Sequence, residues 1–427
     1  MSSQKPKIVI IGAGLAGLRA VKNLARVNAE VLLIDRNNYH TFVPLLYQVA
    51  TGFIPPEAVA YPLRKLLRHA PNPSFLKAEV LEIDFTAKVV KTDERNINYD
   101  YLVIATGSQT KFLGVDGAPK YTYPLQTLDD AVALRYRILS NCEQAISCTD
   151  EERRKQLLTF TIVGGGATGV ELAGALIELI TNTLAKDYRE LDLKQVKVIL
   201  IHSGNRLLAD FPYHLGYYTK RALCRRGVQI HFNTRVTSVM PGAIELEEGS
   251  IIETGTIIWA VGVQANLPVD SEKLATARKD QVCVRSTLQL LEHPEVYAVG
   301  DVAYVKQEGK PLLGIAPEAL QQGTAVASNL KRQLRGLSVK PFNYFNKGTA
   351  AIIARNAGVA YLFGKISLKG YLAWLLWLGI HLYYLPGLSN RLTVLGSWIR
   401  DYLTGERNVR QIFSVSTSTK ITFYDRR

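Results

Sequence analysis

Two glycine-rich turns, each placed directly between a buried strand and a helix, constrain the fold of this chain more than any other feature. The first is Gly12-Ala-Gly-Leu-Ala-Gly17, which follows a predicted strand at residues 7–11 and precedes a predicted helix at residues 18–27. In such a turn Gly12 permits a tight bend, Gly14 lets the backbone approach a pyrophosphate, and Gly17 allows close packing of helix on strand. The amides at the start of the helix favour phosphate. The sequence therefore predicts a dinucleotide site.

An acidic residue completes this first unit. A second strand is predicted at residues 31–35 and ends in Asp35, 18 residues after Gly17. A carboxylate at this place can accept hydrogen bonds from ribose hydroxyls. Because strand, turn, helix, second strand and acid all follow in order, a coincidental glycine pattern is the weaker explanation.

The same pattern occurs again about 150 residues later. A strand at residues 159–163 leads into Gly164-Gly-Gly-Ala-Thr-Gly169, a long helix is predicted from Val170, and a strand follows at residues 196–201. Two phosphate-binding turns imply two dinucleotides. One flavin and one nicotinamide cofactor is the economical interpretation, because hydride transfer needs a donor and a persistent acceptor.

Three further segments run from a strand into a glycine turn: Tyr101-Leu-Val-Ile-Ala-Thr-Gly107, Trp259-Ala-Val-Gly262 and Val296-Tyr-Ala-Val-Gly-Asp301. They predict an α/β fold of two Rossmann-like domains, the two-dinucleotide-binding flavoprotein fold, with a C-terminal membrane-associated helical region. The expected layout is an FAD-binding domain at 1–110 and 285–345, a connecting helical segment at 111–154, an NAD(P)H-binding domain at 155–284 and a membrane-docking region at 346–427.

The C-terminal part differs in character from the rest. Residues 370–386 are almost entirely apolar, but fifteen helical residues span only about 22 Å, short of a hydrocarbon core of roughly 30 Å. Trp374, Trp377, Tyr383 and Tyr384 are of types enriched at membrane interfaces. In a second segment, from Arg391 to Leu403, the apolar residues Leu392, Leu395, Ile399 and Leu403 recur near helical spacing, with Arg391 and Arg400 as basic anchors. We expect residues 370–404 to lie in the surface of a lipid bilayer. A buried helical hairpin or a dimer contact is the alternative.

Charge and cysteine content limit the kinds of partner and site that this chain is expected to have. Lys and Arg exceed Asp and Glu by 14, but the basic residues are dispersed and no nucleic-acid-reading motif accompanies them, so no nucleic-acid partner is expected. The four cysteines, Cys142, Cys148, Cys224 and Cys283, form neither C-x-x-C nor zinc-like spacing, so neither a metal nor a disulfide framework is expected. No signal core or Arg-rich presequence precedes the first strand, which favours a peripheral (monotopic) protein on the cytoplasmic side, unless a presequence has been removed.

These motifs resemble one family. The chain is similar to the type II NAD(P)H:quinone oxidoreductases, or alternative NADH dehydrogenases, from Lys7 to about Ile412. The more specific motifs are residues 38–52, Asn-Tyr-His-Thr-Phe-Val-Pro-Leu-Leu-Tyr-Gln-Val-Ala-Thr-Gly, and the Trp-rich C-terminal segment. The resemblance implies a single-chain respiratory enzyme that holds FAD, takes hydride from NADH or NADPH, and passes electrons to a membrane quinone without pumping protons.

The resemblance also implies roles for individual residues. Glu171 would shape the cofactor and quinone side of the site, although it can also be read as a helix-end charge. Glu171 and Gln321 are the candidate catalytic residues. The implied cofactor-binding residues are Gly12, Ala13, Gly14, Ala16, Gly17, Asp35, Arg36, Thr51, Val80, Ala105, Thr106, Gly107, Gly164, Gly166, Thr168, Gly169, His202, Gly262, Asp301 and Ala319.

Two positions depart from the family pattern. His202 stands where the family usually has an acid that accepts from the 2′-hydroxyl of NADH, so NADPH is also a candidate donor. The family's Ala-Gln-x-Ala-x-Gln motif reads Ala316-Pro-Glu-Ala-Leu-Gln321 here, which replaces the first Gln by Pro317. The sequence therefore leaves open the native quinone, the nicotinamide preference and whether the chain forms a homodimer.

Two other functions are weighed against this one. A sulfide:quinone oxidoreductase would share the fold but needs redox cysteines beside the flavin, and none of the four cysteines lies in such a motif. A non-enzymatic NAD(P)H-responsive flavin protein would differ by lacking turnover with quinone.

Overall fold

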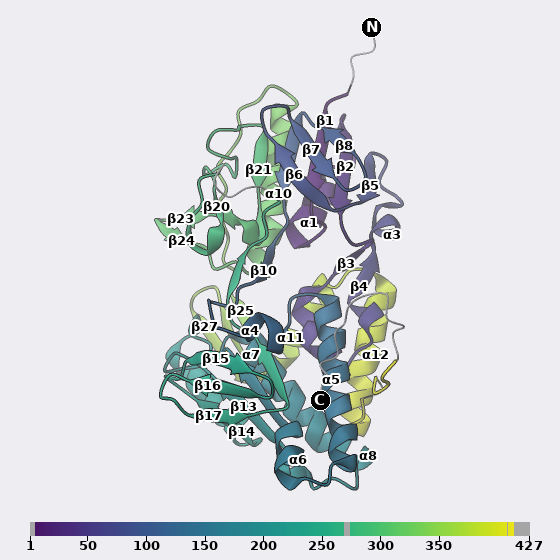
Figure 1. Cartoon of the computed structure of the whole chain (residues 1–427). Helices are drawn as coiled ribbons and strands as arrows, with labels where there is room; N and C mark the ends of the chain where they lie inside the picture. Colours follow the sequence, from purple (N-terminus) through teal and green to yellow (C-terminus); the bar gives the residue numbers. More distant parts are fainter. Residues whose placement is uncertain (1–4, 269–273, 408, 414–427) are drawn as a thin grey trace.

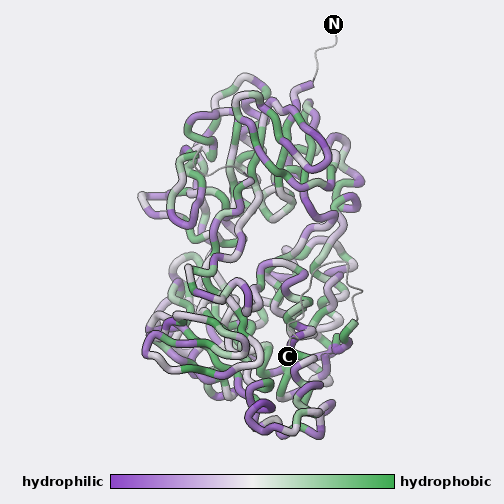
Figure 2. The backbone as a smooth tube through the Cα atoms, in the orientation of Figure 1, coloured by the Kyte–Doolittle hydropathy of each residue, from purple (hydrophilic) through white to green (hydrophobic). Residues whose placement is uncertain are grey.

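The computed structural model describes residues 5–268, 274–407 and 409–413 and has an upper and a lower body in the view of Figure 1. Each body is built on a five-stranded sheet whose strands all run parallel. Parallel sheets are covered on both faces, so their strands are nearly continuous runs of apolar residues. Figure 2 shows this distribution, with hydrophobic residues along the strands and hydrophilic residues on many outer loops. The predicted fold class is confirmed.

The upper sheet has the strand order β21-β9-β1-β2-β5. Its strands are β1 (Lys7–Ile11), β2 (Glu30–Asp35), β5 (Pro73–Lys77), β9 (Tyr101–Ile104) and β21 (Val296–Ala298). Two helices, α1 (Leu15–Asn23) and α10 (Ala316–Gln333), cross so closely that a Cβ on Gly323 would lie 2.3 Å from the carbonyl oxygen of Ala16. A three-stranded sheet of β6 (Val80–Asp84), β7 (Val89–Thr92) and β8 (Asn96–Asn98) adds to this body.

The lower sheet has the order β11-β18-β12-β13-β14. Its strands are β11 (Tyr123–Pro124), β12 (Thr159–Val163), β13 (Lys197–Ile201), β14 (Val228–His231) and β18 (Thr256–Trp259). The helices of this body are α5 (Leu128–Ser147), α6 (Glu151–Leu157), α7 (Ala167–Glu178) and α9 (Tyr213–Cys224), and a π-helical turn at Leu179–Leu184 continues α7. A small sheet of β15 (Val236–Met240), β16 (Ala243–Leu246) and β17 (Ile251–Glu253) lies beside them.

Two pairs of antiparallel strands lie where the chain crosses between the bodies, and the chain crosses again between α10 and β25 (Thr349–Ala354). The strands β10 (Ser108–Thr110) and β19 (Val263–Ala265) pair antiparallel, and so do β3 (Tyr39–Thr41) and β4 (Ala60–Pro62). Between β3 and β4, the short helix α2 (Leu46–Ala50) reaches into the lower body and packs against α5 and α7. Shorter elements are α3 (Leu63–Leu67), α4 (Ala118–Tyr121), α8 (Ala185–Asp187), β20 (Val282–Cys283), β22 (Ala303–Tyr304), β23 (Lys306–Gln307) and β24 (Lys310–Pro311).

The C-terminal part belongs to the lower body. The antiparallel sheet of β25 (Thr349–Ala354), β26 (Ala357–Leu362) and β27 (Ile366–Gly370) packs on α7, where a Cβ on Gly174 would lie 1.6 Å from the carbonyl oxygen of Ile353. Two helices follow, α11 (Tyr371–Tyr384) and α12 (Leu388–Thr404). Within the residues described, no helix combines the length and the apolar character needed to cross a membrane.

Some expected boundaries differ from the observed ones. Helices α1 and α7 begin at Leu15 and Ala167, three residues earlier than predicted, so that each starts directly after the middle glycine of its motif. This start aims the first free amides of each helix at the turn, where a phosphate would bind. The sheet β25-β26-β27 was not predicted; it occupies the first part of the region assigned to membrane docking, whose residues 414–427 lie outside the described chain.

Candidate active site

The three glycines of the first turn have different surroundings. A Cβ on Gly12 would lie 2.3 Å from the carbonyl oxygen of Ala105, and one on Gly17 would lie 1.9 Å from that of Gly12. A Cβ on Gly14, by contrast, would have no neighbour within 4 Å. Two glycines therefore permit close packing while the exposed Gly14 leaves open space, in agreement with the predicted division of their roles.

Asp35 holds this turn in place. Its Oδ2 accepts a hydrogen bond from the amide of Ala13 at 2.7 Å and its Oδ1 accepts one from the amide of Asn37 at 2.8 Å. Burial raises the pKa of the Asp35 carboxyl, and these two amides oppose the rise. The carboxylate thus lies at the end of β2 beside the open glycine, where a ribose would be bound.

The residues after β9 and β21 meet at the same edge of the sheet. The hydroxyl oxygen of Thr106 is buried and has no hydrogen-bond partner within the described chain, which is unusual unless a ligand supplies one. Asp301 accepts a hydrogen bond from the hydroxyl of Ser108 at 2.9 Å. Gly107 has open space around it. An orphaned hydroxyl beside an open glycine and a carboxyl group fits a polar cofactor such as a flavin dinucleotide.

The other residues assigned to cofactor binding lie at the rim or behind this cradle. Arg36 is exposed next to Asp35, and Val80 is half-buried at the start of β6. Ala16 and Ala319 are buried, and both face the place where a Cβ of Gly300 would lie. Thr51 is fully buried at the end of α2, and its hydroxyl donates to the carbonyl of Tyr47.

The second glycine turn repeats the geometry of the first. A Cβ on Gly164 would lie 2.5 Å from the carbonyl oxygen of Ala260, one on Gly169 would lie 1.9 Å from that of Gly164, and one on Gly166 would meet nothing within 4 Å. Thr168 is exposed at the start of α7. Gly262 has φ +77°, and a Cβ there would lie 2.4 Å from the carbonyl oxygen of Lys111. The second turn, called the second glycine cradle below, therefore has the same division between close packing and open space as the first.

His202 is the structural counterpart of Asp35. It follows β13 directly, and its Nδ1 accepts a hydrogen bond from the amide of Gly165 at 3.3 Å. Gly165 follows the first glycine of its motif, as Ala13 does. Burial lowers the pKa of the His202 imidazole, which favours the neutral ring. The side chain of Arg206 donates to the carbonyl of Ala209 in its own loop.

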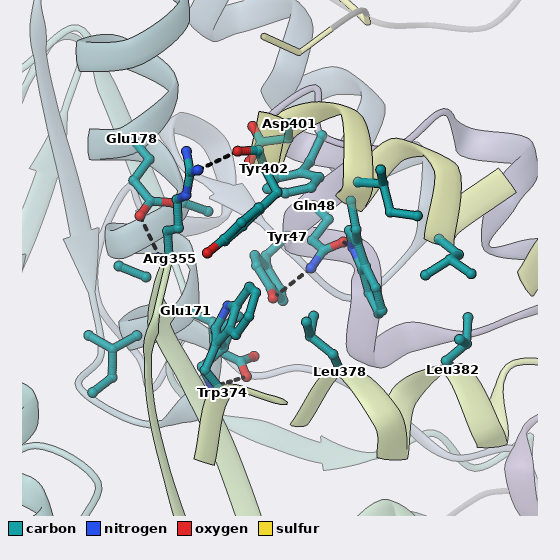
Figure 3. Close-up of a pocket in the computed structure, with 18 of the residues that line it drawn as sticks. Tyr47, Gln48, Glu171, Glu178, Arg355, Trp374, Leu378, Leu382, Asp401 and Tyr402 are labelled. Carbon is teal, nitrogen blue, oxygen red and sulfur yellow. Dashed lines mark hydrogen bonds between the residues drawn. The ribbon is translucent and has the colours of Figure 1, made fainter. Parts of the chain in front are cut away.

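An apolar cavity of about 260 Å³ lies between α2, α7, β25, α11 and α12. Figure 3 shows Leu378 and Leu382 on α11, with Tyr47 and Gln48 facing them. The cavity reaches the surface of α12, where Ile399 and Leu403 are exposed. Its apolar lining residues are Phe53, Ala175, Ile352, Ile353, Ala354, Trp374, Leu378, Leu382, Leu395, Trp398, Ile399 and Leu403.

Glu171 is a carboxyl group in the wall of this apolar cavity. Its Oε1 accepts two hydrogen bonds, from the amide of Ile352 at 3.2 Å and from the indole N–H of Trp377 at 3.0 Å. Burial raises the pKa of Glu171 to about 8, although both donors act to lower it. The carboxyl is therefore protonated near neutral pH, and with Oε1 occupied the proton belongs on Oε2.

Trp377 and Gln321 have surroundings that the sequence alone does not indicate. Trp377, predicted to face the membrane interface, is 0% exposed because its N–H pairs with Glu171 and its ring stacks on His381 at 3.7 Å. Gln321 does not line the cavity. Its side-chain amide donates to the backbone carbonyl of Phe345 and accepts from the backbone N–H of Phe345, both at 2.9 Å. A catalytic role for Gln321 stays a prediction.

Several cavity residues were not singled out from the sequence. Tyr47 and Gln48 lie in the specific motif at residues 38–52, and Gln48 joins Tyr47 to Trp398 through hydrogen bonds of 2.9 and 2.8 Å. The acids Glu178 and Asp401 also line the cavity. An acidic residue in a mostly apolar helix, such as Glu178 at the end of α7, is the signal that could have found one of them.

Comparison with known proteins gives a consistent result. Residues 6–323 match the family described as pyridine nucleotide-disulphide oxidoreductase. The chain is 36% identical over 419 residues to the type II NADH:quinone oxidoreductase Ndh of Mycobacterium tuberculosis, which spans 95% of this chain and 89% of that protein. The structure of NDH2 from Plasmodium falciparum in complex with NADH superposes with a TM-score of 0.88 at 21% identity, covering 95% of this chain and all of that one. Sulfide:quinone oxidoreductase from Aquifex aeolicus shares the fold, with a TM-score of 0.71 at 18% identity over 93% of this chain and 94% of that one.

Proposed function

The chain belongs to the type II NADH:quinone oxidoreductases, and on that basis we propose that it oxidises NADH at the second glycine cradle and reduces a membrane quinone in the apolar cavity beside Glu171. The observation that carries the proposal is the cavity: it is apolar, it opens at α12, and its wall holds a protonated carboxyl group. A quinone has a long apolar tail, which fits the apolar lining of the cavity, and a polar head that must receive protons, which fits the carboxyl group of Glu171.

The stoichiometry defines what the protein must supply. NADH, one proton and the quinone give NAD⁺ and the quinol, so each turnover takes one proton from outside the nicotinamide. Glu171 is placed to hold that proton on Oε2, and Trp377 and Ile352 fix the orientation of the carboxyl group. A bound flavin supplies the two-electron relay between the nicotinamide and the quinone.

We assign FAD to the first cradle. Gly14 leaves space for the pyrophosphate, Asp35 stands beside the ribose position, and Thr106 offers an unpaired buried hydroxyl. The purified protein should be yellow, and denaturation should release FAD that chromatography separates from FMN. Recovery of FMN, or of no flavin, would refute this assignment.

The function itself is tested with detergent-solubilised protein and several quinones. We expect NADH oxidation that depends on added quinone and that acidifies neither side when the protein is reconstituted in closed vesicles. Sulfide should not replace NADH as the electron donor, because none of the four cysteines lines the cavity in the part of the chain that the structure describes.

Membrane attachment is assigned to the outer surfaces of α11 and α12. Leu388, Leu392 and Leu403 are 72%, 59% and 77% exposed, which is costly in water and favourable in the apolar boundary of a bilayer. This arrangement supports a monotopic enzyme whose quinone enters the cavity from the lipid, and we place it on the cytoplasmic side. A homodimer that buries the same surface is the alternative.

Charged substitutions test the membrane assignment. Each of Leu388→Asp, Leu392→Asp and Leu403→Asp should weaken binding to lipid vesicles by about tenfold or more, since each removes roughly 1.5–3 kcal/mol of apolar transfer free energy. Leu81→Asp is the matched control, because Leu81 is 61% exposed on β6 in the upper body. Vesicle co-sedimentation measures the effect. Unchanged sedimentation together with a change from dimer to monomer would support the alternative.

The nicotinamide preference should reflect His202. A neutral imidazole that accepts from Gly165 at Nδ1 keeps its proton on Nε2, so it can donate to a 2′-phosphate and does not repel it. We therefore expect NADPH to be accepted. His202→Glu should shift the ratio of kcat/KM values toward NADH by about tenfold, because the new carboxylate accepts from the 2′-hydroxyl and repels the phosphate. Rejection of NADPH by the wild type, with no shift in the variant, would show that another residue reads this position.

A further inference from the structure

One arginine is almost completely buried next to the cavity. The side chain of Arg407, which follows α12, is 2% exposed. Its Nη1 donates to the carbonyl oxygens of Thr51 at 3.2 Å and Ala175 at 2.7 Å, and its guanidinium lies 4.6 Å from the centre of the Phe53 ring. A guanidinium is not buried without strong partners, because removing its charge from water is costly. The partners of the Arg407 guanidinium therefore indicate the role of this residue.

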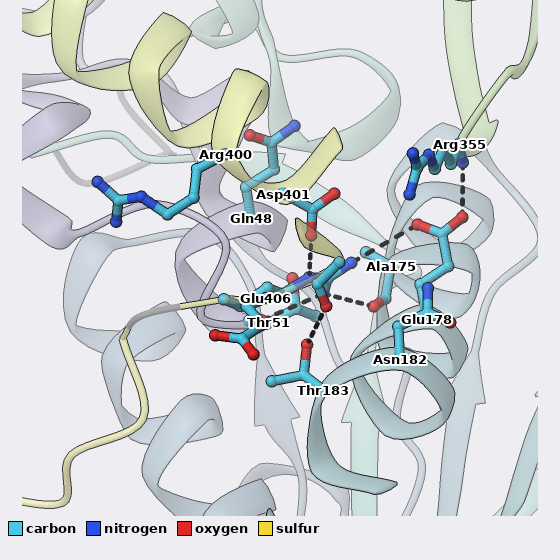
Figure 4. A network of polar contacts seen from close by, with 12 residues as sticks. Gln48, Thr51, Ala175, Glu178, Asn182, Thr183, Arg355, Arg400, Asp401 and Glu406 are labelled. Atoms are coloured by element: carbon cyan, nitrogen blue, oxygen red, sulfur yellow. Dashed lines mark hydrogen bonds and ion pairs between the residues drawn. The ribbon is translucent and has the colours of Figure 1, made fainter. Parts of the chain in front are cut away.

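Its charged partners are two acids of the cavity wall. The Nε of Arg407 lies 3.4 Å from Oδ1 of Asp401 on α12, and its Nη2 lies 3.6 Å from Oε2 of Glu178 at the end of α7. Figure 4 shows Glu178 and Ala175 of α7 brought together with Asp401 of α12 and with Thr51, which follows α2. Two carboxylates on one apolar wall repel each other, and the guanidinium of Arg407 between them offsets this repulsion where α7 and α12 approach.

The chain around Arg407 is attached to the same surface. The carbonyl of Gly405 accepts from the hydroxyl of Thr183 at 3.3 Å, and that of Thr404 accepts from the ammonium group of Lys186 at 3.3 Å. The carbonyl oxygen of Val409 lies only 2.7 Å from where a Cβ of Gly52 would be, so the chain passes directly over the end of α2. Arg407 is the central member of this attachment.

We propose that Arg407 is a positioning residue for quinone reduction, which keeps the α12 wall of the cavity, with Asp401, closed against Glu178 on α7 and against the end of α2. The inference rests on the proposed function of the cavity. None of the contacts of Arg407 described here involves the second glycine cradle, and its contact with Thr51, a residue assigned to the flavin, is to the backbone carbonyl alone. Hydride transfer from NADH should therefore not depend on Arg407.

The central experiment compares the two half-reactions in Arg407→Gln. The KM for quinone should rise about tenfold or more, because charge-assisted contacts that hold the wall are lost. Flavin content, and the rate at which NADH bleaches the flavin absorbance without quinone, should stay at the wild-type values. Arg410→Gln is the matched control: Arg410 lies on the same segment but pairs with Asp187, which does not line the cavity.

Two further variants separate positioning from general stability. Arg407→Lys keeps the charge without the planar fork and should give an intermediate KM. The triple variant with Arg407→Gln, Glu178→Gln and Asp401→Asn removes the unpaired acids as well and should recover part of the loss, since stranded buried carboxylates cause much of the damage.

The outcomes decide the matter as follows. A wild-type KM in Arg407→Gln, or an equal loss of flavin bleaching and quinone reduction, overturns the inference. If Arg407→Gln does not retain flavin, Asp401→Asn decides, because it keeps the buried cation and removes only its partner on α12. A several-fold rise in its quinone KM supports positioning, and an unchanged KM refutes it. Failure of the wild type to reduce any quinone would refute the proposed function instead.

Discussion

Glu171→Gln is expected to lower the turnover of quinone by about a hundredfold, the usual contribution of a well-placed proton donor. The amide retains the shape of the carboxyl group and can still accept the hydrogen bonds of Ile352 and Trp377, so the cavity should keep its form. The flavin content and the rate of flavin reduction by NADH should not change. Stopped-flow spectroscopy of the two half-reactions measures the difference.

The pH dependence gives an independent test of the same group. Because the pKa of Glu171 is raised to about 8, the carboxyl carries its proton below that pH and loses it above. Quinone turnover of the wild type should therefore fall as the pH rises through about 8, and Glu171→Gln should lack this fall. Trp377→Phe removes a donor that lowers the pKa, so the fall should move to higher pH. Wild-type turnover in Glu171→Gln would mean that Glu171 is only a helix-end charge.

Gly17→Ala is expected to yield protein without flavin. The added Cβ would lie 1.9 Å from the carbonyl oxygen of Gly12 and 3.2 Å from the Cβ of Ala105, and neither atom is the end of a flexible side chain that could move aside. Helix α1 must therefore shift away from β1, which destroys the alignment of its first amides with the pyrophosphate position. The ratio of flavin to protein absorbance after purification should fall to near zero.

Two other glycines provide controls for this prediction. Gly396→Ala lies in α12 with nothing within 4 Å of the new atom, so flavin content should not change and the helix should gain roughly 0.5–1 kcal/mol. Gly14→Ala also meets no protein atom, so the fold should persist while the methyl group occupies the space left for the pyrophosphate and weakens flavin binding. Full flavin content in Gly17→Ala would contradict the proposed packing.

The features that the sequence predicts well are local. The roles expected of Gly12, Gly14 and Gly17 follow from a few consecutive residues, and their surroundings fit those roles: close packing at Gly12 and Gly17 and open space at Gly14. The correspondence of His202 with Asp35 could likewise be predicted, since each ends the second strand of a repeated unit. The sequence places the starts of α1 and α7 three residues too late, because glycine disfavours helix and the last glycine of each motif already lies inside the helix.

The features that the sequence does not predict depend on distant contacts. Arg407 joins Asp401 to Thr51 and to α7, and no spacing pattern links Arg407 with residues 232 and 356 positions earlier in the chain. Tryptophan is a residue type enriched at membrane interfaces, but Trp377 is buried. Its hydrogen bond to Glu171 outweighs the general preference of tryptophan for the interface. The sequence does not clearly indicate the strands β25 to β27, because their pattern is weaker than that of the glycine motifs before them and of the apolar helix after them.

Helix α7 has a consequence for how the two substrates communicate. It begins at the proposed nicotinamide site with Gly166 as its N-cap, carries Glu171 in the cavity wall, and ends at Glu178, all within roughly 18 Å of one rigid rod. A displacement of this rod by one substrate is felt at the site of the other. Thermodynamic linkage then makes the effect reciprocal: whatever factor bound nicotinamide imposes on the affinity for quinone, bound quinone imposes on the affinity for nicotinamide.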